Sequence, residues 1–302
     1  MDNLFSRILV GIDDSEPASF AVTYAARLAR DHGGGLVLAS VVNWLPLVAQ
    51  AASSGAYIDV SAIIDALREE AQAVLDRGSE IARRFGVAAE RRMPEGDPRD
   101  MLVALAREEN AGVIVTGTHG RRGAGRMFLG STAEMVLRSS TIPVITVRNA
   151  VAPEREAQRC ISRILIGVDN SEPSDAALDT VLALPPEDCR EVLIYGAVDV
   201  YTPVGVARTA AIEEQHFAET EAIVERAVKA AHERNVHARG FTLEGRPEDV
   251  IVGAAAAAGV DLIVVGSHGR RGLRRFFLGS VAEHVVRSAA APTLVVRTAR
   301  PQ

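Results

Sequence analysis

Two glycine- and arginine-rich segments of nearly the same sequence carry the residues best suited to hold an anion. GTHGRRGAGRMFLGSTAE occupies residues 117–134, and GSHGRRGLRRFFLGSVAE occupies residues 266–283. Glycine lets a backbone turn tightly and bring its amides close to a ligand, while arginine and hydroxyl side chains add charge and hydrogen bonds. This composition indicates a phosphate-binding loop in each segment.

Each loop leads into a predicted helix, which strengthens the expectation of an anion site. In the first segment, Gly130 and Ser131 introduce that helix. The first amides of a helix have no acceptor within it and lie at the positive end of its dipole, so anions bind there. Three arginines of the segment would add positive charge: Arg121, Arg122 and Arg126.

The serine at the helix start also has a purely local interpretation. Ser131 and Glu134 have the spacing of a capping box, in which two side chains satisfy the first amides of their own helix. The second segment repeats that spacing. The capping interpretation stays open for the serines, but it does not account for the spacing of Gly117 and Gly120 upstream.

An aspartate follows the first predicted strand of each half, Asp13 in one and Asp169 in the other. Ligands of doubly wound sheets bind beyond the carboxyl ends of the strands, where the strand order reverses. If the first and fourth strands are neighbours at that point, Asp13 and Gly117 face one crevice. Asp13 is also followed by Asp14 and Ser15, a combination typical of a helix start, so a role in that start is the alternative.

Known catalytic and metal-binding motifs are absent from the sequence. It contains no G-x-x-x-x-G-K-[ST], no G-x-G-x-x-G after the first strand and no G-x-S-x-G. His119 and His268 have no other metal-ligating residues nearby, and Cys160 and Cys189 lack metal-ligand spacing. We therefore predict no catalytic residue and no metal ion bound by the protein alone.

The sequence contains two copies of one domain. RILVGIDDSEP at residues 7–17 returns as RILIGVDNSEP at residues 163–173. The repeat distance falls from 156 residues at the first strand to 149 at the glycine loops, so the second copy is seven residues shorter. The most variable stretch follows the second predicted strand. We predict domains at residues 1–150 and 163–302, joined by a polar linker at residues 151–162.

Strands and helices alternate in each copy. In the first copy, short apolar runs predict strands, and helical spacing with capping signals predicts helices. The predicted strands lie at residues 8–12, 36–42, 88–93, 113–116 and 144–147, and the predicted helices at residues 18–30, 64–85, 98–110 and 131–139. Such alternation predicts an α/β fold, with a parallel sheet covered by helices on both faces.

Composition narrows the class of protein. The 302 residues are 48% hydrophobic and 4% aromatic, with a net charge of −6 and a pI near 5.7. That acidic balance argues against a nucleic-acid partner. No signal peptide, no apolar run of about 20 residues and no disulfide framework is evident, so we expect a cytoplasmic protein with no membrane partner.

The spacing G-x2-G-x9-G-[ST], present in both copies, resembles that of the universal stress protein family in its tandem two-domain form. The resemblance covers nearly the whole chain. It implies two tandem doubly wound domains, each a five-stranded parallel sheet with the strand order 3-2-1-4-5. It also implies that ATP binds in both domains, and Mg²⁺ would enter with the ATP.

The resemblance assigns ligand contacts to residues of both copies. Asp13 would meet the ribose or adenine, the backbone at Val41 and Val42 the adenine, and the glycine loop the phosphates. With Arg126 added for its charge, the predicted residues of the first copy are Asp13, Val41, Val42, Thr116, Gly117, Gly120, Arg126, Gly130, Ser131 and Thr132. Those of the second copy are Asp169, Ala197, Val198, Gly266, Gly269, Gly279, Ser280 and Val281, the last of which lacks the hydroxyl of Thr132.

The family also pairs its domains through the fifth strand. Residues 144–147 and 293–296 would therefore pair antiparallel and form an internal pseudo-dimer, since an exposed apolar edge strand needs cover. A homodimer of two chains is also compatible with the sequence, which does not specify how the chains would meet.

Three functions remain open at this point. The first is a nucleotide-binding stress-response or signalling module with little or no turnover, because no catalytic base or nucleophile is evident. The second is a slow ATPase or autophosphorylating enzyme, in which Asp13 and Asp169 hold Mg²⁺ and Ser131 or Ser280 accepts phosphate. The third is a nucleic-acid binder that uses RRGAGR and RRGLRR, against which the acidic charge and scarce aromatics argue.

Overall fold

The chain divides into two compact units, residues 2–158 and residues 159–302, which we name domain 1 and domain 2. The division falls inside residues 151–162, the segment predicted as a linker. The computed structural model describes residues 4–54, 59–118, 129–150, 152, 155–185, 189–199, 210–269 and 278–298.

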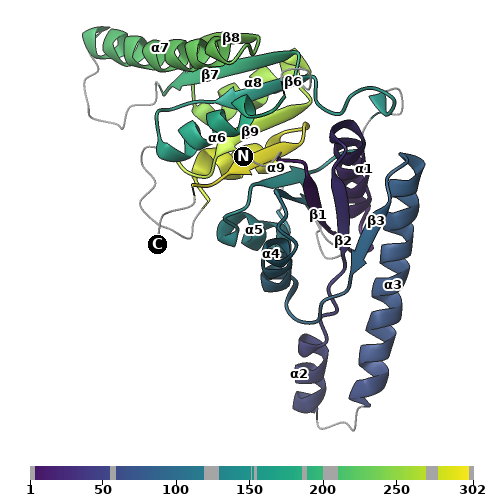
Figure 1. The fold of residues 1–302 in the computed structure, drawn as a ribbon. Coiled ribbons are helices and arrows are strands. Elements are labelled where there is room, and N and C mark those ends of the chain that lie inside the picture. Colours follow the sequence, from purple (N-terminus) through teal and green to yellow (C-terminus); the bar gives the residue numbers. More distant parts are fainter. Residues whose placement is uncertain are drawn as a thin grey trace. The chain divides into compact units, whose positions relative to one another are not determined.

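Strands and helices alternate along domain 1, as the sequence predicted (Figure 1). The elements are β1 (Arg7–Gly11), α1 (Glu16–His32), β2 (Gly35–Ala39), α2 (Leu45–Ser54), α3 (Val60–Arg84), β3 (Ala89–Arg92), α4 (Pro98–Glu108), β4 (Val113–Gly117), α5 (Ser131–Ser139) and β5 (Val144–Val147). The central strands are buried because their apolar runs face helices on both sides of the sheet.

Domain 2 repeats this alternation. Its elements are β6 (Arg163–Gly167), α6 (Glu172–Leu182), β7 (Glu191–Val198), α7 (Ala210–Glu233), β8 (Ala238–Glu244), α8 (Pro247–Ala258), β9 (Leu262–Gly266), α9 (Ser280–Ser288) and β10 (Thr293–Val296). The shortening of the second copy lies between its second and third strands. Leu36 pairs with Ala89 in domain 1 and Val192 pairs with Ala238 in domain 2, which places the seven missing residues there.

All strand pairs within each domain are parallel. The pairings give the order β3-β2-β1-β4-β5 in domain 1 and β8-β7-β6-β9-β10 in domain 2, which is the order that the family resemblance implied. Because such crossovers are right-handed, helices that step toward β3 cover one face and helices that step toward β5 cover the other. In agreement, α1 packs against α3, and α4 packs against α5.

Local signals explain where α1 begins and ends. Ser15 accepts a hydrogen bond from the amide of Ala18, and Gly33 ends the helix with a left-handed backbone (φ 64°) and an N–H bonded to the Ala29 carbonyl. The sequence predicts that cap, because the GGG of residues 33–35 directly follows the helical segment. It did not predict α2, LPLVAQAASS, which lies in the stretch where the two copies differ most.

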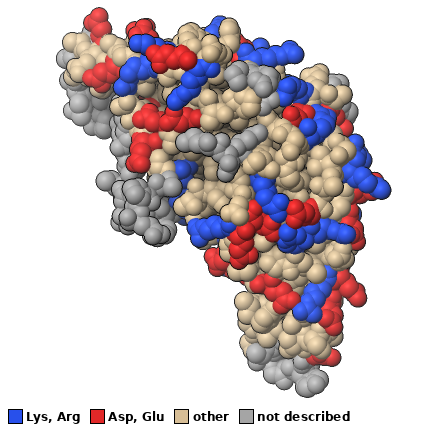
Figure 2. Space-filling model, in the orientation of Figure 1, with Lys and Arg blue, Asp and Glu red and all other residues tan. Residues whose placement is uncertain are grey.

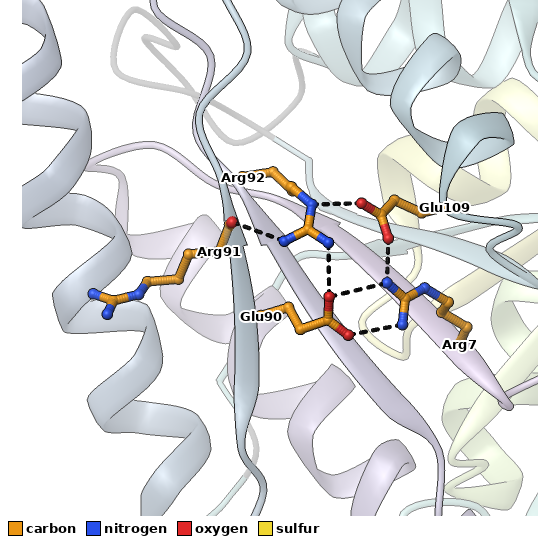
Figure 3. Close-up of polar contacts among 5 residues, drawn as sticks. All are labelled: Arg7, Glu90, Arg91, Arg92 and Glu109. Carbon is orange, nitrogen blue, oxygen red and sulfur yellow. Dashed lines mark hydrogen bonds and ion pairs between the residues drawn. The ribbon is translucent and has the colours of Figure 1, made fainter.

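A cluster of four charged side chains ties β1, β3 and the end of α4 together (Figure 3). Arg7 Nη1 lies 2.9 Å from Glu90 Oε1, and Arg92 Nη2 lies 2.7 Å from Glu90 Oε2. Glu109 accepts hydrogen bonds from both arginines. The hydrogen bonds from Arg7 and Arg92 lower the pKa of Glu90 to about 2, and the same two arginines lower the pKa of Glu109.

Candidate functional site

Domain 2 contains a cleft of about 610 Å³ beyond the carboxyl ends of β6, β7 and β9. β6 lies between β7 and β9, so this is the place where the strand order reverses. Doubly wound folds bind their ligands at such a place. The cleft is lined by every residue predicted for the second copy: Asp169, Ala197, Val198, Gly266, Gly269, Gly279, Ser280 and Val281.

Three helices turn their first residues toward this cleft. Ser174 of α6, Pro247 of α8 and Ser280 of α9 all line it, and each belongs to the first turn of its helix. The positive ends of three helix dipoles therefore converge on one space. This arrangement favours a ligand that carries negative charge.

The glycines that end the fourth strand of each domain have a packing role. A Cβ on Gly266 would lie 2.7 Å from the carbonyl carbon of Pro173, and a Cβ on Gly117 would lie 2.8 Å from that of Pro17. No side chain fits there, because the strand end lies directly against the start of the helix that follows the first strand. In each domain, the glycine therefore lets the end of the fourth strand lie directly against the start of the helix that follows the first strand.

Asp169 stands between the helix start and the cleft. Its Oδ1 accepts hydrogen bonds from the Ser171 amide (3.0 Å) and the Ser171 hydroxyl (2.6 Å), which organises the start of α6. Its Oδ2 faces the glycine loop, since a Cβ on Gly269 would lie 2.6 Å from it. A role of Asp169 in the helix start is therefore compatible with a role at the cleft.

Asp13 makes the corresponding contacts in domain 1. Its Oδ1 accepts hydrogen bonds from the amide of Ser15 (3.1 Å) and from the Ser15 hydroxyl. β1 pairs with β4 up to Thr116, so the aspartate follows β1 at the edge of the sheet where β4 also ends. Thr116 itself is buried, and its hydroxyl donates to the carbonyl of Gly117 (3.2 Å).

The capping-box interpretation of Ser131 and Ser280 is wrong. The N-caps of α5 and α9 are Gly130 and Gly279, and neither helix has a side-chain cap. The backbone amide of each of these two glycines bonds to a carbonyl just after the fourth strand of its domain. In domain 2, Gly279 N bonds to Ser267 O at 2.8 Å. Each serine lies one position too far into its helix to cap it. Ser280 is exposed and lines the cleft, and its hydroxyl does not cap α9.

The glutamates of the two expected capping boxes have other partners. Glu134 pairs with Arg138 at 2.7 Å, and Glu283 pairs with Arg287 at 2.7 Å. Each pair spans one helical turn, a spacing at which opposite charges meet. The glutamates are therefore held along their own helices rather than turned back to the helix start.

The backbone at the end of β7 presents hydrogen-bonding groups to the cleft. Val198 accepts a hydrogen bond from Gly245 N (3.0 Å), on the β8 side. Alternate residues of a strand direct their backbone groups to opposite sides, so Ala197 directs its groups to the β6 side. β6 has ended by then, since its last bond to β7 joins Val168 N to Tyr195 O. Ala197 is therefore the residue of this strand end whose peptide groups face the cleft.

The same alternation holds in domain 1. Val42 donates to Pro94 O (2.9 Å) and accepts from Gly96 N (3.1 Å), so both of its backbone groups face the β3 side. Val41 precedes it and directs its backbone groups to the other side. Of the two valines predicted to meet the adenine, Val41 thus has the better placed peptide groups.

Sequence reasoning missed an arginine that holds the loop after the first strand in each domain. Arg226 of α7 donates to Asn170 Oδ1 at 2.7 Å, and Arg77 of α3 pairs with Asp14. Asn170 directly follows Asp169, and Asp14 directly follows Asp13. The repeat carries the signal, because both arginines stand at the same place in the two copies.

Sequence reasoning also missed the cleft wall formed by β7, α7 and α8. Its polar residues in domain 2 are Tyr195, Asp199, His216, Glu219, Thr220, Arg246 and Glu248. Burial raises the pKa of the Tyr195 phenol, so this side chain is neutral at physiological pH. No motif marks these residues, because most of them differ between the two copies.

Some predicted residues lie outside the described part of the chain. These are Gly120 and Arg126, with His119 and the other loop arginines, Arg121, Arg122, Arg270, Arg271, Arg274 and Arg275. Thr132, at the start of α5, is described and half-buried. On the face drawn in Figure 2, acidic and basic side chains are interspersed.

Two features are absent from the part of the chain that the structure describes. They contain no group of three or more histidine, cysteine or acidic side chains arranged to hold a metal ion. None of the described helices combines the length and the apolar character needed to cross a membrane.

A profile of the universal stress protein family matches residues 4–148 and again residues 161–297. The chain belongs to the universal stress protein family. A universal stress protein of Mycolicibacterium smegmatis is 26% identical to it over 296 residues, with 96% of each chain covered. One of Mycobacterium tuberculosis is 31% identical over 312 residues, again with 96% of each chain covered. These universal stress proteins share the tandem arrangement over nearly their whole length.

A solved structure has the same fold. A universal stress protein from Archaeoglobus fulgidus superposes with a TM-score of 0.70, at 21% identity, over 99% of this chain and 98% of that chain. At 21% identity, this likeness supports a shared fold and nothing further.

Proposed function

We propose that this universal stress protein binds ATP in each of its two domains and holds it with little or no turnover, as a stress-response or signalling module. The observation that supports the proposal is the cleft of domain 2, around which all eight predicted residues gather. They extend from Asp169 to Val281 along the chain, so local turn and helix requirements do not by themselves bring them together.

The cleft offers the groups that a nucleotide needs. The peptide groups of Ala197 suit the edge of a base, and Asp169 suits a ribose or an exocyclic amine. The helix starts and the Ser280 hydroxyl suit phosphate oxygens, without the lysine that a P-loop requires. Mg²⁺ would arrive with ATP rather than occupy a site of its own.

Two details support holding over hydrolysis. Asp169 Oδ1 already accepts two hydrogen bonds from Ser171, so this oxygen is engaged at the start of α6. Ser267 Oγ lies 3.0 Å from His268 Nδ1, as a nucleophile and its base would, but Ser267 is only 2% exposed. Its hydroxyl is therefore not accessible to a substrate.

One observation favours a second candidate, an autophosphorylating enzyme or slow ATPase. Ser280 is exposed at a helix start and does not cap the helix, so its hydroxyl is available as a phosphate acceptor. Single-turnover incubation with γ-labelled ATP and Mg²⁺ tests this. Label on the protein that disappears in Ser131→Ala plus Ser280→Ala would favour it, whereas hydrolysis no faster than in Asp13→Ala plus Asp169→Ala would remove it.

The binding proposal is tested by calorimetry with ATP on the full chain. Thr132→Trp and Val281→Trp place a bulky side chain at the start of α5 and α9, where each ligand would sit. We expect two ATP per wild-type chain, one in either single variant and none in the double variant. ADP, AMP and cyclic AMP are titrated in parallel, and mass spectrometry identifies any ligand released from the purified protein.

Matched controls lie on the same helices. Ser139→Trp and Ser288→Trp put the same side chain at the exposed far ends of α5 and α9 and are expected to leave both sites intact. A wild-type chain that binds no adenine nucleotide, or a double variant that still binds two ATP, contradicts the proposed function.

A further inference from the structure

A groove of about 750 Å³ lies in domain 2 between α7 and β8, the strand at the edge of its sheet (Figure 1). Its apolar lining comes from Phe217, Val224 and Val228 of α7 and from Gly240 of β8. It shares no described lining residue with the proposed nucleotide cleft. The groove is therefore a second cavity with surroundings of its own.

In domain 1 an arginine bridges the corresponding strand and helix. Arg91 of β3 pairs with Asp76 of α3. The two sheets have the same register here, since Arg91 pairs with Leu38 and Gly240 pairs with Ile194, at the same position of the second strand. Gly240 therefore stands in domain 2 where Arg91 stands in domain 1, and it has no side chain to reach across the groove.

The helix of domain 2 keeps a carboxylate at the place of the bridge. Glu225 of α7 corresponds to Asp76 of α3, because each directly precedes the arginine that holds the loop after the first strand. Glu225 is exposed, lines the groove and forms no ion pair with a described residue. Glu221 and Glu233 also line the groove, together with one ammonium group, that of Lys229. The described lining thus offers apolar surface and an excess of carboxylates to a cation.

β8 also directs backbone groups toward an open edge. His237 O and Gly245 N both bond to β7. Alternate residues of a strand direct their backbone groups to opposite sides, so Gly240 and Thr242, which line the groove, direct theirs away from β7. An extended chain can pair with such an edge. The edge strand of domain 1 is shorter and more charged, AERR against ARGFTLE, as protected edges are.

We propose that the groove between α7 and β8 binds an extended, arginine-bearing segment of a partner protein. The segment adds a strand to the open edge of β8, and its guanidinium pairs with Glu225, as Arg91 pairs with Asp76 in domain 1. The excess of carboxylates favours a basic segment over an acidic one. The open backbone edge favours an extended chain over a helix.

The probe is a capped peptide, TVTRVTV, whose β-branched residues favour an extended chain and whose arginine supplies the guanidinium. Its control carries citrulline, which keeps the shape of arginine without the charge. Fluorescence anisotropy with the full chain measures the binding of both peptides. We expect the arginine peptide to bind, and the citrulline peptide to bind roughly tenfold or more weakly, the worth of a hydrogen bond between charged groups.

Two variants of the chain locate the binding. Glu225→Gln should weaken the arginine peptide roughly tenfold or more and leave the citrulline peptide unchanged. Thr242→Pro removes an outward N–H while keeping the pairing with β7, so it should abolish the binding of both peptides. Two matched controls should leave binding unchanged. They are Glu214→Gln, at an exposed position of α7 outside the described lining, and Met93→Pro, at the corresponding position of domain 1.

Three results overturn the inference: no binding of the arginine peptide, equal binding of the arginine and citrulline peptides, or binding that both variants leave unchanged. Sedimentation of the chain without peptide covers another occupant. A dimer that Thr242→Pro abolishes would assign the edge of β8 to a second copy of this chain and would also overturn the inference. The citrulline comparison needs no variant, so a misfolded variant does not end the test.

Discussion

At the scale of single residues, the glycine that ends the fourth strand of each domain is required for packing. Gly117 and Gly266 are required by the backbone that lies against them, not by a ligand. Their variants therefore change the fold before they change the site. Blocking substitutions that leave these glycines in place, such as Val281→Trp, are the better probes of binding.

Gly266→Ala tests the packing role. Its Cβ would meet the backbone of Pro173 and Ser174 within 3 Å, so we expect a loss of about 1–3 kcal/mol in the free energy of unfolding. Gly253→Ala is the matched control, since nothing lies within 4 Å of its Cβ in the middle of α8. Alanine favours a helix, so that variant should gain about 0.5–1 kcal/mol. Urea unfolding of both variants decides, and equal stability of the two would contradict the packing argument.

At the scale of elements, the site is assembled from helix starts of two kinds. The helix after the first strand has a serine cap, Ser171 Oγ accepting from Ser174 N in domain 2, whereas the helix after the fourth strand has a glycine cap. A side chain that caps its own helix is occupied, while a glycine cap leaves the first amides and the next hydroxyl to a ligand. In domain 2, a side chain therefore caps the start of α6, whereas no side chain caps the start of α9.

This difference predicts opposite effects for two serine variants. Ser171→Ala removes a helix cap and should destabilise the fold by about 1 kcal/mol. Ser280→Ala should leave stability within about 0.5 kcal/mol of the wild type but weaken ATP binding at domain 2 roughly threefold to tenfold, the worth of one hydrogen bond. Thermal unfolding and calorimetry separate the two readouts. Equal losses of stability in both variants would restore the capping role of Ser280.

At the scale of the whole molecule, a charged cluster links the elements of domain 1 (Figure 3). Arg7 is the first residue of β1, Arg92 is the last residue of β3, and Glu109 lies at the end of α4. The cluster therefore joins three elements and should contribute to the stability of the domain. Pairing of residues 144–147 with residues 293–296, and a cytoplasmic location, stay predictions.

Acid should expose the contribution of this cluster. The pKa of Glu90 is lowered from 4.5 to about 2, so its stabilisation is complete above pH 4.5 and is lost as the pH falls toward 2. Glu109→Gln should reduce stability by about 1–3 kcal/mol at pH 7. Because Arg7 and Arg92 lower the pKa of Glu109, this deficit relative to the wild type should shrink once acid protonates Glu109 in the wild type. Glu80→Gln, in an exposed pair with Arg83, should change stability by less than about 0.5 kcal/mol. A deficit that does not change with pH would contradict the assignment.

The sequence by itself determined the repeat and the alternation of strands and helices, and it placed Asp169 and Gly266 at one crevice; the family resemblance supplied the other predicted residues that line the cleft of domain 2. Periodicity and spacing carry the first part because apolar runs must be buried and the carboxyl ends of parallel strands meet at one edge. It could not find α2, which lies where the two copies differ most, or the cleft wall with Arg246, whose charge differs from that of its counterpart Asp97.

Only the tertiary structure decided between roles that one local pattern permits. Ser131 with Glu134 has the spacing of a capping box, yet the helix begins one residue earlier, with Gly130 as its cap. Asp169 was compatible with a helix start or a ligand site, and its two oxygens divide between them. The physical reason is the same in both cases. Where a helix begins and where a side chain points depend on segments far apart in the chain, such as β9 against the start of α6, and local spacing does not contain those contacts.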